Sequence, residues 1–351
     1  MGLGWIARTV HLPYLDAAPF ATLIGVHDSD ASRTQETADH YGVVGFESLH
    51  DLLATEADVI FVCTPPSDHA HSVVEALRHG KHVVCEKPLT VSAADAEFME
   101  HLARERGLAL FCCLTNRHRR DTKRLRQEVM SGVIGTPMYL RASWLRSQGI
   151  PTSPGAVEQG VMWDLGSHLV DLALWLTGWR TPTSVTAARL RLSGDARSAV
   201  ASWHSGEEGD ILGGNAADTA LIDMVFGNDA AAHIEVSWAA RVPDDRIELL
   251  LVGSEGVCRL HTVFGWSPAR KTVPNPPLAV ADRKTRLWQP LIHHQQRDQE
   301  EYAAQLDYFF EGLHRQQFHR DELAIAVDAI RVLAAADENV GQITRTVRSE
   351  V

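Results

Sequence analysis

Between Ala21 and Cys113, short apolar runs alternate regularly with amphipathic stretches. The apolar runs read ATLIGVH, DVIFVC, KHVVCE and LALFCC, and helical periodicity appears in residues 31–41, 67–79 and 92–106. This alternation is typical of a parallel sheet whose strands are joined by crossover helices. Ser92, with Asp95 three positions later, adds a helix start signal. We therefore predict a doubly wound α/β fold for this part of the chain.

After Thr136 the pattern changes to strand-like segments separated by turn signals. The segments read MYLRASWLR, SVTAARLRL, TALIDMVF, AHIEVSW, IELLLVG and GVCRLHTVF. They predict an antiparallel or mixed sheet. Helices are expected at residues 163–177, 299–315 and 319–338, and residues 265–298 are expected to form an irregular surface segment.

The chain has 351 residues, more than one hydrophobic core usually supports. We therefore expect two domains. Residues 1–118 form the α/β domain, and residues 119–351 form an α+β domain with a large open, mostly antiparallel sheet. The C-terminal helices are free, in this scheme, to pack back on the first domain.

The composition limits the partners of the chain. A formal net charge of −12 argues against nucleic acid and against an anionic membrane surface, because both favour a surplus of Lys and Arg. The five cysteines form no C-x-x-C pair, and most lie in apolar runs, as expected for reduced thiols. A charged leader and a membrane-spanning apolar run are both missing from the sequence. We expect a cytoplasmic protein that binds a small molecule.

The sequence opens with a glycine turn, Gly2-Leu3-Gly4-Trp5-Ile6-Ala7, which fits the pattern G-x-G-x-x-A. Such a turn brings backbone N–H groups and a helix N-terminus to the pyrophosphate of a dinucleotide. Asp28 follows the next strand and is placed to accept hydrogen bonds from ribose hydroxyls. A carboxylate there repels a 2′-phosphate, so NAD is favoured over NADP. Arg33 is the residue that can reverse this preference.

A strand normally precedes such a glycine turn, but here Met1 is followed at once by Gly2. A central parallel strand contributes much of the packing of its sheet. Our hypothesis is that the natural protein carries several more apolar residues ahead of Met1. Intact-mass analysis of protein from the native host would test it.

A lysine and a helix carry the candidate chemistry. Lys87 lies between Glu86 and Pro88, after the strand KHVVC, at the sheet edge where open α/β sheets bind ligands. Asp164, His168 and Asp171 are spaced i, i+4 and i+7, which places them on one helix face. Each feature also has a plainer interpretation, a surface lysine and a solvated polar stripe. Asp164 and His168 could also bind zinc, but without a convincing third ligand we predict no metal.

Several motifs together resemble the glucose-fructose oxidoreductase, inositol dehydrogenase and MocA (Gfo/Idh/MocA) family. They are the glycine turn, C-T-P-P-S-D-H-A at 63–70, E-K-P at 86–88, Asn116-Arg117, D-x-G-x-H at 164–168 and the closing Y-A-A-Q-L-D-Y-F helix. The resemblance covers nearly the whole chain. It implies a Rossmann domain that binds NAD(P), followed by a domain built on a large open sheet.

The resemblance also implies residue roles. Lys87 would contact the reacting hydroxyl and the nicotinamide ribose, His168 would be the acid/base, and Asp164 would bind substrate and orient the other two. The cofactor would be lined by Thr64, Pro65, His69, Glu86 and Asn116, and Arg146 and Trp163 would join the substrate contacts. Two positions depart from the family pattern, Arg119 in place of an aromatic residue and Trp163 in place of a smaller one.

These groups suit hydride transfer from a secondary alcohol. A histidine with a near-neutral pKa can take the hydroxyl proton, and a nearby ammonium stabilises the developing alkoxide. We predict a dehydrogenase or reductase that acts on a sugar, amino sugar or cyclitol. An NAD-dependent glycoside-cleaving enzyme and a non-catalytic NAD-binding sensor remain alternatives, although the presence of both Lys87 and His168 argues against the sensor.

The strands of the second domain carry apolar residues on both faces. TALIDMVF and IELLLVG show little polar alternation, whereas a sheet with one solvated face should alternate. One face would cover helices of its own chain and the other would meet a partner. We expect a homodimer or homotetramer, and the family resemblance implies the same.

Overall fold

A computed structural model of the chain describes residues 1–147, 149–151, 159–191, 217–264, 276–292 and 300–340. It divides into two compact units, one of Met1–Leu114 with Tyr302–Val327 and one of Thr115–Glu301 with Asp328–Val351. The predicted boundary lay after residue 118, with the C-terminal helices free to pack back on the first domain. In the structure, Tyr302–Val327 belongs to the first unit.

The first unit holds two small parallel sheets. One has the order β3 (Val59–Val62), β4 (His82–Cys85) and β5 (Leu110–Cys112), and the other pairs β1 (Gly25–Val26) with β2 (Val44–Gly45). The predicted strand at 21–27 is therefore reduced to two residues. Helices cover these strands: α1 (Leu12–Ala17), α2 (Ala31–Tyr41), α3 (Leu49–Leu53), α4 (Pro66–Arg78), α5 (Ala93–Glu105) and α9 (Glu300–His314).

Side chains define where two of these helices begin. The Asp30 carboxylate accepts from the backbone N–H groups of Ser32 and Arg33 at the start of α2, and the Ser92 hydroxyl accepts from that of Asp95 at the start of α5. Because these caps act within three residues, the sequence predicts the two helices well.

Met1 and Gly2 lie between the two small sheets. The Met1 nitrogen donates to Phe61 O at 2.7 Å, and Cys63 N donates to Met1 O at 2.9 Å, which is the bonding of a parallel ladder. Gly2 N donates to His27 O at 2.9 Å on the other side. These two residues therefore supply the hydrogen bonds that a strand between β1 and β3 makes at its carboxyl end.

Helix α9 belongs to the first unit because of its apolar face. Leu306 and Phe309 are buried against Val84 of β4 and Phe111 of β5. The Tyr14 hydroxyl of α1 donates to the Asp307 carboxylate at 2.6 Å. The C-terminal segment thus completes the core of the N-terminal sheet.

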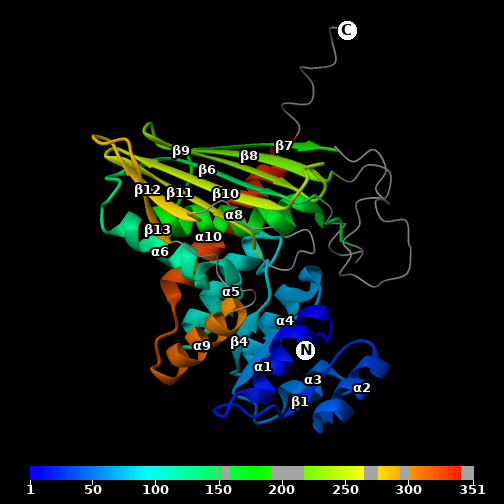
Figure 1. Cartoon of the computed structure of the whole chain (residues 1–351). Helices are drawn as coiled ribbons and strands as arrows, with labels where there is room; N and C mark the ends of the chain where they lie inside the picture. The colour runs from blue at the N-terminus through cyan, green and yellow to red at the C-terminus, as the bar shows by residue number, and fades with distance from the viewer. Residues whose placement is uncertain (148, 152–158, 192–216, 265–275, 293–299, 341–351) are drawn as a thin grey trace, which may run out of the picture. The chain divides into compact units, whose positions relative to one another are not determined.

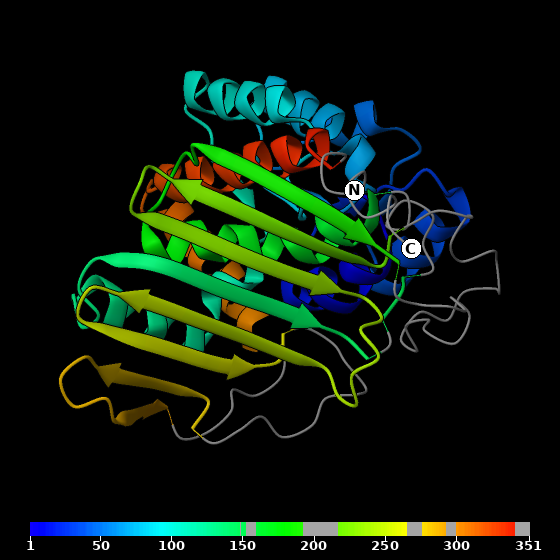
Figure 2. The same ribbon diagram turned by 90° about the horizontal axis from the view of Figure 1, so that it is seen from above.

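The second unit is built on an eight-stranded sheet with the order β13-β12-β11-β10-β6-β9-β8-β7. All pairs are antiparallel except β6 with β9. The strands are β6 (Pro137–Leu145), β7 (Ser184–Leu190), β8 (Thr219–Phe226), β9 (Ala230–Ser237), β10 (Arg246–Gly253), β11 (Gly256–Thr262), β12 (Leu278–Asp282) and β13 (Trp288–Ile292). Figures 1 and 2 show this sheet from two directions.

The expected irregular segment at 265–298 is wrong for its central part. Residues Leu278–Asp282 and Trp288–Ile292 extend the sheet at one edge, while 265–275 and 293–299 lie outside the described residues. Pro290 has no backbone N–H to donate, and it is tolerated in β13 because β13 is an edge strand.

Helices pack on one face of this sheet. Figure 1 shows α8 (Ser167–Thr177) and α6 (Arg120–Met130) beneath it, and Figure 2 shows the other face in front of them. Alternate strand residues such as Leu140, Ile234 and Leu249 are buried on the helix side. Helix α10 (Arg320–Glu338) follows α9 in the chain. No helix among the described residues has the length and apolarity that crossing a bilayer requires.

Candidate cofactor and catalytic sites

The glycine turn requires glycine at its first position. Gly2 has φ +74°, and a Cβ there would lie 2.5 Å from the backbone of Cys63 and Thr64. A Cβ at Gly4 would meet nothing within 4 Å, so Gly4 leaves open space beside the turn. Trp5 and Ile6 lead from the turn into the first helix. The turn thus combines close packing at Gly2 with free access at Gly4, as backbone binding of a ligand needs.

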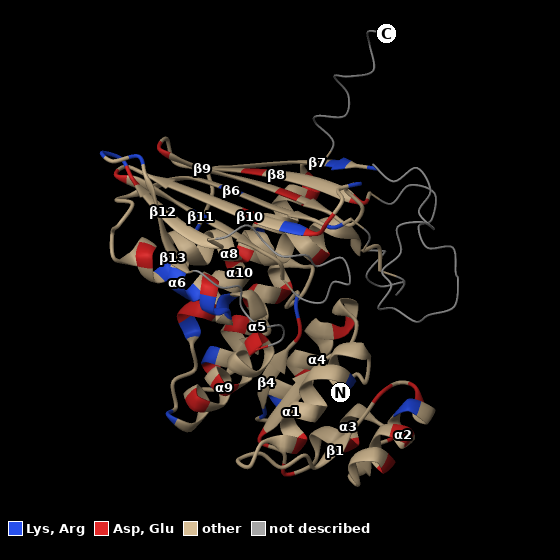
Figure 3. Cartoon of the chain, viewed as in Figure 1, with Lys and Arg blue, Asp and Glu red and all other residues tan. Residues whose placement is uncertain are grey.

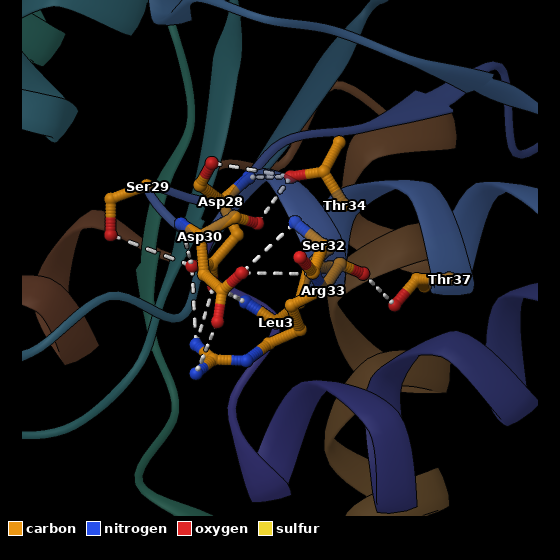
Figure 4. A network of polar contacts seen from close by, with 8 residues as sticks. All are labelled: Leu3, Asp28, Ser29, Asp30, Ser32, Arg33, Thr34 and Thr37. Carbon is orange, nitrogen blue, oxygen red and sulfur yellow. Dashed lines mark hydrogen bonds and ion pairs between the residues drawn. The ribbon is translucent and has the colours of Figure 1, made fainter.

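Asp28 organises the end of the first βαβ unit (Figure 4). Its carboxylate accepts from Leu3 N at 2.6 Å and from Asp30 N at 2.9 Å, and its side chain is 6% exposed. Burial alone would raise the pKa of Asp28, but the N–H groups of Asp30 and Leu3 and the charge of Arg33 hold that pKa below its usual value. The carboxylate therefore stays ionised and fixes the glycine turn to α2.

Arg33 forms an ion pair with the same carboxylate. Its Nη1 lies 3.1 Å from Asp28 Oδ1, and its side chain is 38% exposed (Figure 4). The position that was predicted to recognise a ribose is therefore a carboxylate with a guanidinium beside it. Asp28 and Arg33, the two residues predicted to select between NAD and NADP, are therefore in direct contact.

A π-helical turn follows the glycine turn, which the sequence analysis missed. It spans Ala7–His11, and Leu12 N–H donates to Ala7 O. The turn directs His11 to Glu86, and the two side chains hydrogen-bond at 2.7 Å with little exposure. Burial alone would raise the pKa of Glu86, but the hydrogen bond and charge of His11 and the charge of Lys87 hold it below the usual value. Glu86 is therefore an ionised, mostly buried carboxylate next to Lys87.

Cys113 lies beside this pair, so His11, Glu86 and Cys113 offer ligand atoms within 4.8 Å of one another. Burial raises the pKa of the Cys113 thiol well above its usual value. A protonated thiol is a poor metal ligand. The hydrogen bond between His11 and Glu86 accounts for the arrangement without an ion.

His69 lies in α4 and joins the two segments that follow β3 and β4. Its ring nitrogens lie 2.8 Å from Thr64 O and 2.8 Å from Pro88 O, and the residue is 1% exposed. Burial lowers the pKa of His69. The resemblance implied that His69 lines the cofactor. In the structure it holds the segment at Thr64 against the segment that carries Lys87, and its contact with the cofactor stays a prediction.

In the second unit, a second π-helical turn carries Asp164. It spans Met162–Gly166 and runs directly into α8, which begins at Ser167. π-turns inside helices are frequent at functional sites. Trp163 is 4% exposed, and its ring nitrogen lies 3.5 Å from Asp337 Oδ2, so this predicted substrate contact is packed within the unit.

Two tryptophans from the sheet hold the predicted catalytic pair of this unit. Trp238 Nε1 donates to Asp164 Oδ2 at 2.8 Å, and the ring of Trp144 lies 5.5 Å from that of His168. Arg146 places its guanidinium 5.1 Å from the Trp144 ring centre. The structure therefore brings Asp164, His168 and Arg146 to one region, with tryptophan contacts that the sequence analysis did not foresee.

Asp171, the third member of the predicted polar stripe, has a structural role. It is 1% exposed, and Arg117 Nε donates to its Oδ2 at 2.8 Å. Arg119, the departure from the family pattern, is likewise buried and contacts Asp121 at 2.8 Å and Glu301 at 3.0 Å. These ion pairs fix the segment at the start of the second unit.

Two residues predicted to contact the cofactor each have a buried side-chain atom that makes no hydrogen bond among the described residues. Thr64 Oγ1 in the first unit and Asn116 Nδ2 in the second have no partner among the described residues. Such atoms usually find partners in folded proteins. Lys87 belongs to the first unit, whereas Asp164 and His168 belong to the second.

Comparison with known families gives two matches that together span most of the chain. Residues 1–113 match the model described as an oxidoreductase family with an NAD-binding Rossmann fold. Residues 122–259 match the GFO/IDH/MocA C-terminal domain.

Individual relatives are sugar-modifying enzymes by name. A putative UDP-kanosamine synthase oxidoreductase subunit of Amycolatopsis mediterranei is 29% identical, over 83% of this chain and 82% of its own. The D-glucoside 3-dehydrogenase of Escherichia coli is 30% identical, over 70% and 71%. The solved structure of UDP-N-acetylglucosamine 3-dehydrogenase from Acidithiobacillus ferrooxidans superposes with a TM-score of 0.70 at 27% identity, over 96% of this chain and 94% of that one.

Proposed function

Because the chain belongs to the Gfo/Idh/MocA oxidoreductase family, we propose that it transfers a hydride between a nicotinamide cofactor and a ring hydroxyl of a sugar. The observation that carries the proposal is the arrangement at the start of α8. There Trp238 donates a hydrogen bond to the carboxylate of Asp164, and Trp144 packs against the imidazole of His168. The other unit carries the glycine turn. Such groups suit proton transfer at an alcohol.

The names of the relatives narrow the substrate. A D-glucoside dehydrogenase and a UDP-N-acetylglucosamine dehydrogenase both act at position 3. We therefore infer that the substrate is a hexose with a substituent at its anomeric carbon, such as a glycoside or a nucleotide sugar, and that the 3-hydroxyl reacts. Arg146, whose guanidinium lies over the Trp144 ring that contacts His168, supports a substrate that carries phosphate.

Residues at the glycine turn fit the binding of a nicotinamide cofactor. Within the first unit, Gly4 leaves room at the turn, and Thr64 Oγ1 is a buried polar atom that a ligand can satisfy. The nicotinamide supplies the hydride chemistry when the cofactor is bound. His168 takes the hydroxyl proton, the Lys87 ammonium stabilises the negative charge on the oxygen, and Asp164 orients the substrate.

A substrate screen tests the proposal. UDP-N-acetylglucosamine, UDP-glucose, methyl glucosides and free cyclitols are incubated with the protein and NAD or NADP, and reduced cofactor is followed by its absorbance. We expect net reduction with at least one anomerically substituted hexose and a 3-keto product by NMR. Release of free sugar without net reduction would instead favour the glycoside-cleaving alternative, and a lack of reaction with all classes would defeat the proposal.

We propose NAD as the preferred cofactor, because Asp28 is ionised and lies at the end of β1. Replacing Asp28 with Ala should weaken NAD binding by about tenfold or more, since hydrogen bonds to a charged group are lost. It should weaken NADP binding less. Titration of cofactor fluorescence measures both dissociation constants.

Arg33→Ala serves as the control for this interpretation. It removes the ion pair but keeps the carboxylate, so the preference for NAD should remain or increase. If the unmodified protein already binds NADP more tightly, and Arg33→Ala removes that preference, then Arg33 rather than Asp28 selects the cofactor.

We further propose that the outer face of the eight-stranded sheet meets a second copy of the chain. On β8 and β10 the residues pointing away from the helices include Leu221, Val225, Leu250 and Val252, beside Asp223 and Glu248. Figure 3 shows tan stretches between the few charged residues of β8 and β10, whereas charged residues lie closer together on α6. A face of this composition favours contact with protein.

Light scattering at micromolar concentration tests the assembly. We expect a mass of at least twice the 38.7 kDa of one chain. Replacing Val225 and Leu250 with Lys should shift the mass to that of one chain, while Lys at exposed Phe98 of α5 should not. A mass near 38.7 kDa for the unmodified protein would contradict the proposal.

A further inference from the structure

Trp238 is buried and makes hydrogen bonds through both its backbone and its side chain. It follows β9 directly, is 0% exposed, and its backbone N–H donates to Asp218 O at 2.8 Å. Two residues later, Ala240 N donates to Arg146 O at 2.9 Å. These backbone bonds tie the end of β9 to Asp218 and to the segment after β6.

The single polar atom of this indole points at Asp164. Trp238 Nε1 lies 2.8 Å from Asp164 Oδ2. An indole N–H can only donate, so Asp164 is the acceptor, and Oδ2 is committed to this bond. The bond therefore restricts the rotation of the Asp164 carboxylate.

The parallel pairing of β6 with β9 explains why Trp238 reaches Asp164. β6 and β9 run parallel, with Trp144 paired to Val236, so the carboxyl ends of both strands lie at the same sheet edge. Trp144 then lies against His168, and Trp238 bonds Asp164. One sheet edge thus supports both predicted catalytic side chains.

We propose that Trp238 is a positioning residue for the hydride-transfer reaction, acting by fixing the carboxylate of Asp164 through its indole N–H. The inference rests on the proposed function. Phe at position 238 fills most of the same space but removes the donor, so Trp238→Phe should lower kcat/KM by about tenfold or more. Most of the loss should be in kcat, because a carboxylate that lacks this donor still binds substrate but is held less firmly in the reactive orientation.

A double-mutant cycle shows whether Trp238 acts through Asp164. Kinetics are measured for Trp238→Phe, Asp164→Ala and the double variant, with melting temperatures for all. If the two residues act as a unit, the double variant is no slower than Asp164→Ala alone. Trp175→Phe is the matched control, since Trp175 is a buried indole of α8 whose N–H has no partner among the described residues. Additive losses, or an equal loss of kcat/KM in Trp175→Phe, would overturn the proposal.

Indole NMR keeps this test separate from the test of function. The chain has nine tryptophans, and Trp238→Phe identifies one indole N–H peak by removing it. That peak should move markedly in Asp164→Ala and stay in place in Trp175→Phe. An unmoved peak would overturn the contact whatever the enzyme does. If the peak moves but no sugar is turned over by the unmodified protein, the proposed function fails and the positioning role fails with it, while the hydrogen bond stands.

Discussion

Replacing Lys87 or His168 with Ala should lower kcat by about two to four orders of magnitude, the range that positioned proton transfer and charge stabilisation contribute. Lys87 follows β4 beside the mostly buried carboxylate of Glu86, and His168 is the second residue of α8. Neither supplies the glycine turn or the Asp28 network. The dissociation constant for NAD should therefore change only a few-fold. Steady-state kinetics and cofactor titration measure the two effects.

Matched controls come from the same units. Lys81→Ala removes a lysine whose ammonium donates to Thr55 O, and His233→Ala removes a half-exposed histidine paired with Asp223 on the sheet. Both should keep kcat within a few-fold of the unmodified protein. Turnover at that level in Lys87→Ala or His168→Ala would remove the residue concerned from the mechanism.

Asp171→Ala should destabilise the second unit by about 3–5 kcal/mol, because it leaves the Arg117 guanidinium buried without its carboxylate. Arg117 is 4% exposed, so water cannot replace the lost partner. Urea unfolding followed by tryptophan fluorescence measures the change in the free energy of unfolding. Replacing both residues together, Arg117→Met with Asp171→Leu, should recover most of that loss, since no charge is then left buried.

The control for this prediction is an ion pair on the surface, between Glu100 and Arg104. Glu100→Ala breaks a contact of 3.1 Å with Arg104, whose side chain is 60% exposed, and should change the free energy of unfolding by less than about 1 kcal/mol. A loss below that value in Asp171→Ala would show that the Arg117 pair contributes no more than a surface contact.

The sequence predicted those elements whose signals are local. Helices α2 and α5 agree with the predicted ranges because their caps act within three residues, and β6 to β11 agree because each strand keeps a run of apolar or alternating residues. Strands β12 and β13 were missed because Pro290 and the neighbouring polar residues obscure the pattern, although pairing with β11 is enough to order them. Strand β1 is shorter than predicted because apolar residues alone do not provide a hydrogen-bonded neighbour.

In the candidate site, too, the sequence predicted contacts between nearby residues and missed contacts between distant ones. Gly2, Asp28 and Arg33 are close in sequence, so their association follows from one βαβ pattern. By contrast, Trp238 and Asp164 are 74 positions apart and His11 and Glu86 are 75 apart, and no periodicity connects them. Such partners are set by the order of strands in a sheet, which a single sequence does not display. The roles of Lys87 and His168 stay predictions until they are measured.

The π-turn at Ala7–His11 affects how relatives of this chain should be aligned. A helix that makes one bond of the π type accommodates one more residue than an α-helix does between the same two fixed points. The glycine turn and the His11 contact to Glu86 are such points, since each is bound elsewhere. A homologue with one residue fewer before this histidine can therefore keep both contacts by forming a regular α-helix. In such a homologue the glycine and the histidine would be one residue closer in sequence, and an alignment without a gap between them would pair the wrong residues.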